Sequence, residues 1–340
     1  MSSTPSASPR PTSATAVRRP SGGHQPRPTS ATAVGHQSLP SATDRPPAPR
    51  ERALVLGGGG SAGNAWLIGV IAGLGEAGLD VTDADLVVGT SAGATAAAQI
   101  AGRTPADLFA DILAAPAAPR TGPTAGAGRA PHASVAEHLE RTGRIIAAAA
   151  DPADMRRRLG AAALDLEAAS DGSAHVRWRA IVASRLPDQE WPQRALLVTA
   201  VDARTGEPVV FDRDRGVDLV DAVAASTSSG LPYRIGDERY LDGGYRRNEN
   251  ADLAAGYGRV LVLSPLGGRT RTALEWGMHL DAQAAELRAG GSRVETILPD
   301  GRSLDAFGGN LMDPSTRTPA ARAGRDQGLA VAERLSGFWR

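Results

Sequence analysis

The sequence has no cysteine and no lysine, and it has few aromatic residues. The lack of cysteine excludes disulfides, thiolate metal ligands and a cysteine nucleophile. Lysine plus arginine and aspartate plus glutamate number 37 each, so the formal net charge is zero and the basic excess typical of nucleic-acid binding is missing. Because only 4% of residues are aromatic, the core must be built mostly from alanine, valine, leucine and isoleucine. We attribute the missing lysine and the heavy use of alanine and glycine to codon bias.

Long hydrophobic runs are also missing. No stretch approaches about 18 uninterrupted apolar residues, so no transmembrane helix is expected. The N-terminus is polar and lacks the apolar segment of a signal peptide, which favours a cytoplasmic location with only peripheral membrane contact. Asp212, Asp214 and Asp218 have no histidine or glutamate at metal-binding spacing, so neither calcium nor another cofactor is expected.

Residues 1–50 differ in composition from the rest of the chain. They are rich in proline, serine, threonine and alanine, and the phrase Arg-Pro-Thr-Ser-Ala-Thr-Ala-Val occurs twice, beginning at Arg10 and Arg27. Such a segment buries too little apolar surface to offset its ordering entropy, so we expect a disordered tail. Residues 51–340 are expected to form one α/β domain, with a helical insertion at about 104–175 that covers the sheet.

From residue 52 onward, short apolar runs alternate with segments of helical periodicity. This order predicts a three-layer α/β/α fold with a mainly parallel central sheet and right-handed crossovers. The expected strands are 53–56, 86–88, 195–199, 208–211, 259–263 and 293–298. The expected helices are 62–77, 92–101, 135–150, 152–169, 219–225, 272–289 and 317–335.

The most informative motif is G-x-S-x-G, formed by Gly89, Ser91 and Gly93. It follows the buried strand expected at 86–88 and precedes the helix expected at 92–101. Glycine two positions either side of the serine lets strand and helix approach without Cβ clashes. One interpretation is a serine that fits the turn and has no catalytic role. The flanking strand and helix favour instead a nucleophile elbow, which exposes a hydroxyl for acyl transfer.

Four successive glycines, Gly57–Gly60, lie between the first strand and the first helix. Successive glycines allow backbone amides to converge on an anion at a helix N-terminus. The anion is either a dinucleotide pyrophosphate, because Gly58-x-Gly60-x-x-Gly63 matches that fingerprint, or the oxyanion of an ester under attack. A dinucleotide site needs an acidic residue at the end of the second strand, where this sequence has Gly89. The glycine at that position therefore favours the ester oxyanion over a dinucleotide pyrophosphate as the bound anion.

A third element is Asp242-Gly-Gly244, which follows apolar residues at a strand end. Aspartate is common in turns, so Asp242 could be a turn residue with no catalytic role. However, a stretch of small residues from Ala224 to Pro232 precedes it and is able to pack closely against a reactive site. Burial of Asp242 without a cationic partner is expected to raise the pKa of its carboxyl group toward neutral, which a general base requires.

Together these segments resemble the patatin-like phospholipase family over roughly residues 52–265. The resemblance rests on Gly57–Gly63, Gly89–Gly93, Ala224–Ser226 with Pro232, and Asp242–Gly244. It implies a patatin-like fold and a serine hydrolase of lipid esters, such as phospholipids, lysophospholipids or glycerides. Ser91 would be the nucleophile and Asp242 its general base. The backbone amides of Gly58, Gly59 and Gly60 would form the oxyanion hole, with Ala92 as a further donor.

The sequence departs from the family at one position of the glycine loop. Many members carry arginine or lysine before the last glycine, whereas this sequence has Ala62. The departure keeps two alternatives open: a non-catalytic binding module with this fold, and a dinucleotide-binding protein. His279 is the only histidine after Asp242, as a Ser–acid–His order would require. It lies in an expected helix, and we interpret it as structural.

Overall fold

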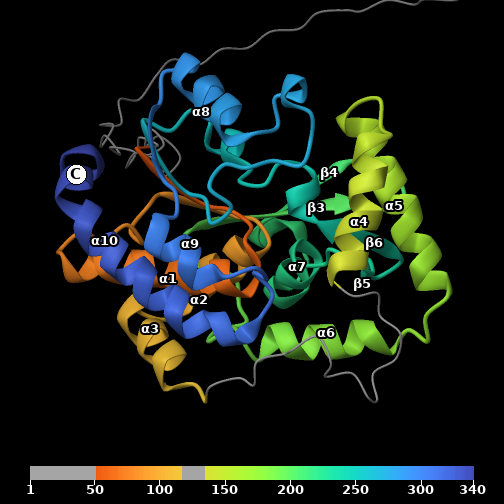
Figure 1. The fold of residues 1–340 in the computed structure, drawn as a ribbon, viewed down its shortest axis with the longest axis horizontal. Helices are drawn as coiled ribbons and strands as arrows, with labels where there is room; N and C mark the ends of the chain where they lie inside the picture. The colour runs from red at the N-terminus through yellow and green to blue at the C-terminus, as the bar shows by residue number, and fades with distance from the viewer. Residues whose placement is uncertain (1–50, 117–134) are drawn as a thin grey trace, which may run out of the picture. The chain divides into compact units, whose positions relative to one another are not determined.

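The computed structural model describes residues 51–116 and 135–340. Residues 1–50 and 117–134 lie outside the described residues, so the disorder expected for 1–50 stays a prediction. In the described part, a mostly parallel sheet carries helices around it (Figure 1). This arrangement confirms the predicted α/β class.

The sheet is parallel at its centre and antiparallel toward one edge. Its spatial order is β5, β6, β3, β2, β1, β7, β8, and β4 pairs with β3. The parallel pairs are β1–β2, β1–β7, β2–β3 and β7–β8. β3–β4, β3–β6 and β5–β6 are antiparallel. The strands are β1 (Arg52–Leu56), β2 (Leu86–Gly89), β3 (Ala195–Asp202), β4 (Pro208–Phe211), β5 (Tyr233–Ile235), β6 (Glu238–Asp242), β7 (Arg259–Leu263) and β8 (Arg293–Ile297).

The α-helices largely follow the predicted positions. They are α1 (Gly60–Glu76), α2 (Ala92–Gly102), α3 (Pro105–Ala114), α4 (Val135–Ala147), α5 (Pro152–Ala168), α6 (Ser173–Ala183), α7 (Leu219–Ser226), α8 (Leu280–Ala289), α9 (Gly301–Phe307) and α10 (Arg317–Trp339). Short 3₁₀ helices are η1 (Arg213–Arg215), η2 (Gly243–Tyr245), η3 (Ala251–Ala254), η4 (Leu274–Trp276) and η5 (Pro314–Thr316). None of the helices in the described segments combines the length and apolar character that crossing a bilayer requires.

One predicted helix is wrong in its first half. Residues 272–289 were expected to be continuously helical, but η4 is followed by Gly277 at φ +63° and α8 begins only at Leu280. A left-handed glycine ends the short helix and redirects the chain. β5, α3, α6 and α9 were not predicted as separate elements, because each is short.

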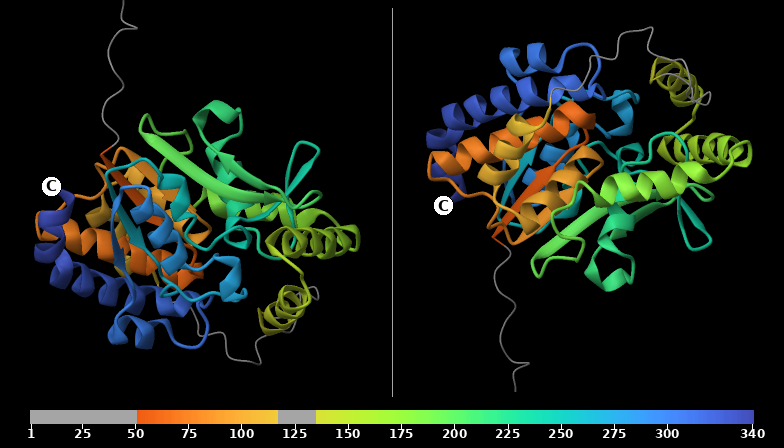
Figure 2. Two further views of the ribbon diagram at one scale, coloured as in Figure 1. Left: turned by 90° about the horizontal axis from the view of Figure 1, so that it is seen from above. Right: turned by 90° about the horizontal axis from the view of Figure 1, so that it is seen from below.

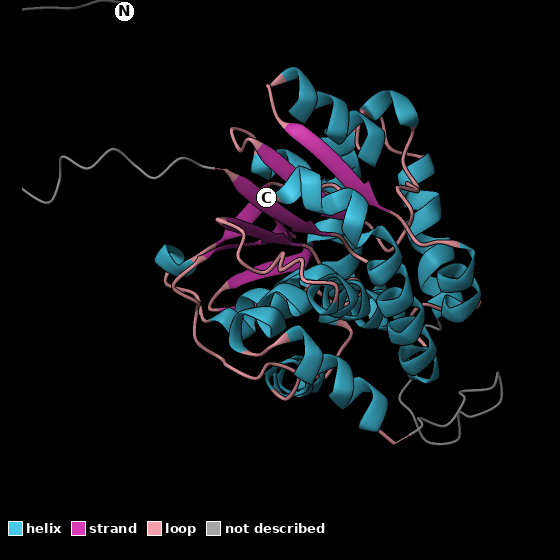
Figure 3. Cartoon of the chain, turned by 90° about the vertical axis from the view of Figure 1, so that its left-hand side faces the viewer, coloured by secondary structure: helices cyan, strands magenta, loops and turns pink. Residues whose placement is uncertain are grey.

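The central strands are buried on both faces, as parallel strands between two helical layers must be. In β1, Leu54 and Leu56 face a core shared with α1, α2 and α10, whereas Ala53 and Val55 face a second core that includes residues of α8. All four side chains are fully buried. Figure 3 shows strands enclosed by helices on either side.

Glycine has a packing role in the layer formed by α1 and α10, which run side by side (Figure 2). A Cβ atom at Gly69 would lie 2.2 Å from the carbonyl oxygen of Ala321, and one at Gly73 would lie 2.2 Å from that of Arg325. From the other helix, a Cβ at Gly324 would lie 2.5 Å from the carbonyl oxygen of Trp66. The attribution of glycine use to codon bias is therefore wrong at these positions, where backbone-to-backbone contact excludes a side chain.

The region predicted as a helical insertion contains α3, α4 and α5 within its described residues. α4 and α5 pack beside the antiparallel end of the sheet: Ile146 and Met155 share a small core with Val201 of β3 and Leu241 of β6. This cluster stands next to the end of β6, where Asp242 lies.

Candidate active site

Ser91 occupies a sharp turn between β2 and α2. Its backbone has φ +53° and ψ −114°, a conformation that costs a non-glycine residue free energy. A Cβ at Gly93 would lie 1.9 Å from the carbonyl oxygen of Leu56, and one at Gly89 would lie 2.6 Å from Cα of Ala94. Both glycines are therefore needed for the strand and helix to approach, as the G-x-S-x-G spacing predicts. The backbone N–H of Ser91 donates to Oγ of Ser226 at 2.9 Å.

The structure brings Ser91 and Asp242 together from positions far apart in the chain. Ser91 Oγ donates a hydrogen bond to Asp242 Oδ2 at 2.7 Å. The other carboxylate oxygen, Oδ1, accepts the backbone N–H of Gly244 at 2.8 Å. The backbone N–H of Asp242 donates to the carbonyl of Ser228 at 2.8 Å. The carboxylate is thus held at both oxygens and at its backbone, with one oxygen directed at the serine hydroxyl.

The Asp242 carboxyl group has an unusual electrostatic environment. Burial raises its pKa from 3.8 to about 6, although the hydrogen bonds from Gly244 and Ser91 act in the opposite direction. Only 9% of the residue is exposed, and no ion pair to it forms among the described residues. A carboxylate with a pKa near 6 is a far better proton acceptor at neutral pH than an ordinary aspartate.

The glycine loop lies against the serine, but its amides are not equivalent. A Cβ at Gly58 would be 3.6 Å from Cβ of Ser91. The N–H of Gly58 donates to the carbonyl of Asn248 at 3.1 Å, which differs from its predicted role as an oxyanion donor. Within the described residues, the amides of Gly59, Gly60 and Ala92 have no hydrogen-bond partner. These three remain able to donate to a ligand.

An arginine from α10 lies at the C-terminal end of the glycine loop. Ala62, at the position of the missing loop cation, is fully buried. Arg317 of α10 donates through Nη1 to the carbonyl of Ser61 and to Oδ1 of Asn64, both at 3.1 Å. Burial lowers the pKa of Arg317 to about 10, with a further contribution from the nearby charge of Arg185. Sequence reasoning missed this residue because it lies more than 250 positions from the loop.

A buried polar network behind the serine was also missed. Asn250 is fully buried with φ +56°, and its Nδ2 lies 2.9 Å from Oγ1 of Thr90 and 3.1 Å from Oγ1 of Thr199. The same atom lies 3.2 Å from the carbonyl oxygen of Gly243. It therefore links the residue that follows β2 to β3 and to the turn after Asp242. The only signal in the sequence is that asparagine tolerates left-handed backbone better than most residues do.

His279 precedes the first residue of α8 rather than lying within a helix. Its Nδ1 is buried and has no hydrogen-bond partner in the segments that the structure describes. It forms no hydrogen bond with Ser91 or Asp242, which bond to each other. Within the same segments, no cluster of histidine, aspartate and glutamate has the arrangement of a metal site.

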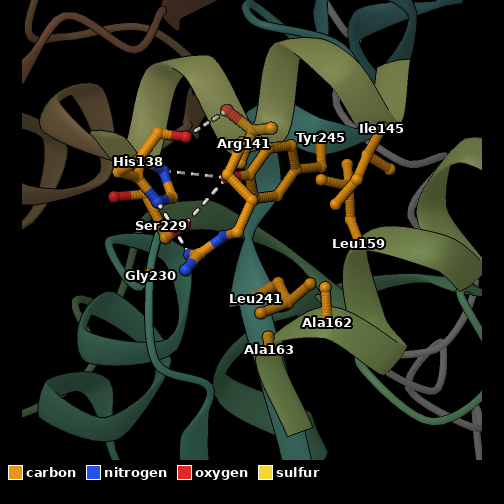
Figure 4. A pocket seen from close by; sticks show the side chains of 11 residues that line it. His138, Arg141, Ile145, Leu159, Ala162, Ala163, Ser229, Gly230, Leu241 and Tyr245 are labelled. Carbon is orange, nitrogen blue, oxygen red and sulfur yellow. Dashed lines mark hydrogen bonds between the residues drawn. The ribbon is translucent and has the colours of Figure 1, made fainter. Parts of the chain in front are cut away.

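A small pocket lies beside the strand end that carries Asp242 (Figure 4). It is lined by His138 and Arg141 of α4 and by Ser229, Leu241 and Tyr245, with Ser229 drawn next to His138. The hydroxyl of Tyr245 donates to the carbonyl of Ser229 at 2.8 Å. The unfilled space at the centre is about 10 Å³, room for about one water molecule. Burial lowers the pKa of His138, and the charges of Arg141 and Arg271 lower it further.

The fold and this geometry define an α/β protein in which a strained serine meets a buried carboxylate at the edge of a glycine loop. The model of the family described as patatin-like phospholipase matches residues 54–255, and the chain belongs to this family. Membership supports lipid hydrolysis as the activity. No curated protein matches the sequence.

Two solved structures are similar in backbone. VipD from Legionella pneumophila has a TM-score of 0.40 and 14% identity, over 84% of this chain and 67% of its own. The type III effector protein ExoU has a TM-score of 0.35 and 15% identity, over 84% of this chain. The match spans about half of the ExoU chain, 53%.

Proposed function

We propose that the protein is a serine hydrolase of lipid carboxylic esters, with Ser91 as nucleophile and Asp242 as general base. The observation that carries the proposal is the 2.7 Å hydrogen bond from Ser91 Oγ to a buried Asp242 carboxylate whose pKa is raised to about 6. Family membership supports the substrate class. The strained turn supports the nucleophile, since backbone strain of this kind clusters at reactive positions.

The reaction proceeds in two halves. Asp242 accepts the Ser91 proton as Oγ attacks the acyl carbonyl carbon, and the tetrahedral oxyanion receives hydrogen bonds from Gly59, Gly60 and Ala92. The C–O bond to the alcohol then breaks, and the alcohol leaves with the proton from Asp242. In the second half, water transfers a proton to Asp242 as its oxygen attacks the acyl carbonyl carbon. The bond between Ser91 Oγ and the acyl carbon then breaks, Asp242 returns the proton to Oγ, and the carboxylic acid is released. Each oxyanion donor contributes about 3–4 kcal/mol of transition-state stabilisation.

The alternatives receive less support. The end of β2 carries Gly89 and no acidic side chain, so the chain lacks the ribose-binding group of a dinucleotide site. A non-catalytic binding module would not require a serine proton donor directed at a carboxylate with a raised pKa. The cytoplasmic location with peripheral membrane contact, drawn from the sequence, stays a prediction.

A fluorophosphonate probe followed by turnover assays tests the proposal. Wild-type protein should be labelled at Ser91, and Ser91→Ala should lose labelling and at least about 10⁴-fold of its turnover of p-nitrophenyl esters. His279→Ala should keep turnover near the wild-type level. A folded wild-type protein that resists labelling would favour the binding module, and a large loss in His279→Ala would indicate a catalytic triad.

A further inference from the structure

Among the residues that the structure describes, two arginines near the small pocket have no carboxylate partner: Arg141 lines the pocket, and Arg271 bonds to the pocket residue Thr142. Arg141 is on α4, and Arg271 lies just before η4. Neither forms an ion pair within residues 51–116 and 135–340. On the neighbouring α5, by contrast, Arg158 pairs with Asp154 at 2.7 Å. Two guanidinium groups near one histidine repel each other and oppose its protonation, so an anion placed there would be bound favourably.

Most of the hydrogen-bond donors of these arginines are unused by the protein. Arg271 donates through Nη2 to the carbonyl of Leu139 at 2.6 Å and to Oγ1 of Thr142 at 2.9 Å. Arg141 reaches only Nδ1 of His138, at 3.4 Å, and its buried Nε has no partner in the described part of the chain. A guanidinium group has five N–H donors in a planar fork that matches phosphate oxygens. Both arginines therefore have donors left for a ligand.

The pair lies close to the proposed base. Tyr245, three positions after Asp242, has its hydroxyl 3.4 Å from Nε2 of His138. Burial raises the pKa of Tyr245, and the charge of Asp242 raises it further. The backbone of Ser228, just before the pocket residue Ser229, accepts the Asp242 N–H. The pocket residues Ser229 and Leu241 therefore adjoin the two residues of this contact, and Arg141 lines the same pocket.

We propose that Arg141 and Arg271 form an anion subsite that binds the phosphate of a glycerophospholipid substrate while the acyl ester lies at Ser91. The subsite rests on the proposed function and narrows its substrate to phosphate-bearing lipids. The interior of the pocket holds about one water, so the phosphate lies outside it, against the exposed Arg271 and the half-buried Arg141. On the glycine loop, Gly60 borders the exposed apolar side chain of Met312, which suits an acyl chain.

A comparison of two soluble substrates tests the subsite. A short-chain lysophosphatidylcholine below its critical micelle concentration and the monoacylglycerol with the same acyl chain differ in the phosphocholine group alone. In Arg141→Gln, the ratio of kcat/KM for the phospholipid to that for the glyceride should fall at least about tenfold, as for the loss of one charge-assisted hydrogen bond. This change should appear as a higher KM for the phospholipid. Arg271→Gln should act in the same direction.

Two control variants separate the explanations. Arg144→Gln removes the same charge from an exposed position of α4 and should leave the ratio unchanged. Arg141→Lys keeps the charge and should recover part of the ratio. Because Arg271 also bonds to the backbone of α4, Arg141→Gln carries the test if Arg271→Gln loosens that helix.

The outcomes distinguish the subsite from the hydrolase itself. If wild type hydrolyses both substrates and the ratio does not change in Arg141→Gln or Arg271→Gln, the subsite is wrong and the hydrolase proposal stands. If wild type hydrolyses no ester, the proposed function fails. Inorganic phosphate should compete with the phospholipid in wild type and lose this effect in Arg141→Gln. Phosphate inhibition that depends on Arg141 without any change in the ratio would indicate a site for free phosphate and overturn the assignment to the lipid.

Discussion

The layer of α1, α10 and the central strands differs from the region of α4 and the antiparallel strand end in how its parts are held together. In the first, backbones touch through glycines such as Gly69 and Gly324, and the side chains of residues 53–56 in β1 are fully buried. In the second, α4 is attached by a few apolar contacts around Ile146 and by polar bonds from Arg271, and Leu139 is 48% exposed. The strained serine and the glycine loop belong to the first region, whereas Asp242, Arg141 and Arg271 belong to the second. The difference teaches that the proposed catalytic pair joins a closely packed layer to a more open one, and that the proposed anion subsite lies on the open side.

The largest effect on stability should come from the reactive carboxylate itself. The folded-state pKa of Asp242 is raised from 3.8 to about 6, so between these values the native state binds more protons than the unfolded chain. Stability therefore falls as pH rises through this interval, by up to about 3 kcal/mol, and the loss is complete above pH 6. Asp242→Asn removes the titration and should be more stable than wild type at pH 7, while its ester turnover is heavily reduced.

Urea unfolding of both proteins at pH 4.5 and pH 7 measures this effect. The free energy of unfolding of Asp242→Asn minus that of wild type should be larger at pH 7 than at pH 4.5. An equal difference at the two pH values would show that Asp242 has an ordinary pKa and would remove the main electrostatic argument for its role as base.

A second test compares two glycines of the same helix. Gly69→Ala places a Cβ 2.2 Å from the carbonyl oxygen of Ala321 and should destabilise the protein by about 1–3 kcal/mol through overpacking. Gly75→Ala, also in α1, meets nothing within 4 Å and should stabilise it by about 0.5–1 kcal/mol, because alanine favours helix more than glycine does. Chemical denaturation at neutral pH gives both values. Equal signs for the two substitutions would contradict the close contact of α1 with α10.

The strands and the turn around the serine were predictable because local residue patterns specify them. The apolar runs of β1 and β7, and the glycines either side of Ser91, each specify their own conformation within a few residues. The pairing with Asp242 was predictable only through the family resemblance, since nothing local links positions 151 apart. Arg317 and the pair formed by Arg141 and Arg271 were not predictable, because an unpaired arginine looks like any surface arginine until the fold shows which carboxylates are absent around it.

The smallest effect should come from the outer face of α4. Leu139→Ala removes a side chain that is 48% exposed and replaces it with a strong helix former, so the free energy of unfolding should change by no more than about 0.5 kcal/mol. Ile146→Ala, on the buried face of the same helix, is the matched comparison and should cost more, because Ile146 packs with Met155 and Leu159. Urea titrations of the two variants rank them directly. A loss for Leu139→Ala as large as that for Ile146→Ala would mean that both faces of α4 are packed equally tightly. It would contradict the view that the region of α4 is more open than the layer of α1 and α10.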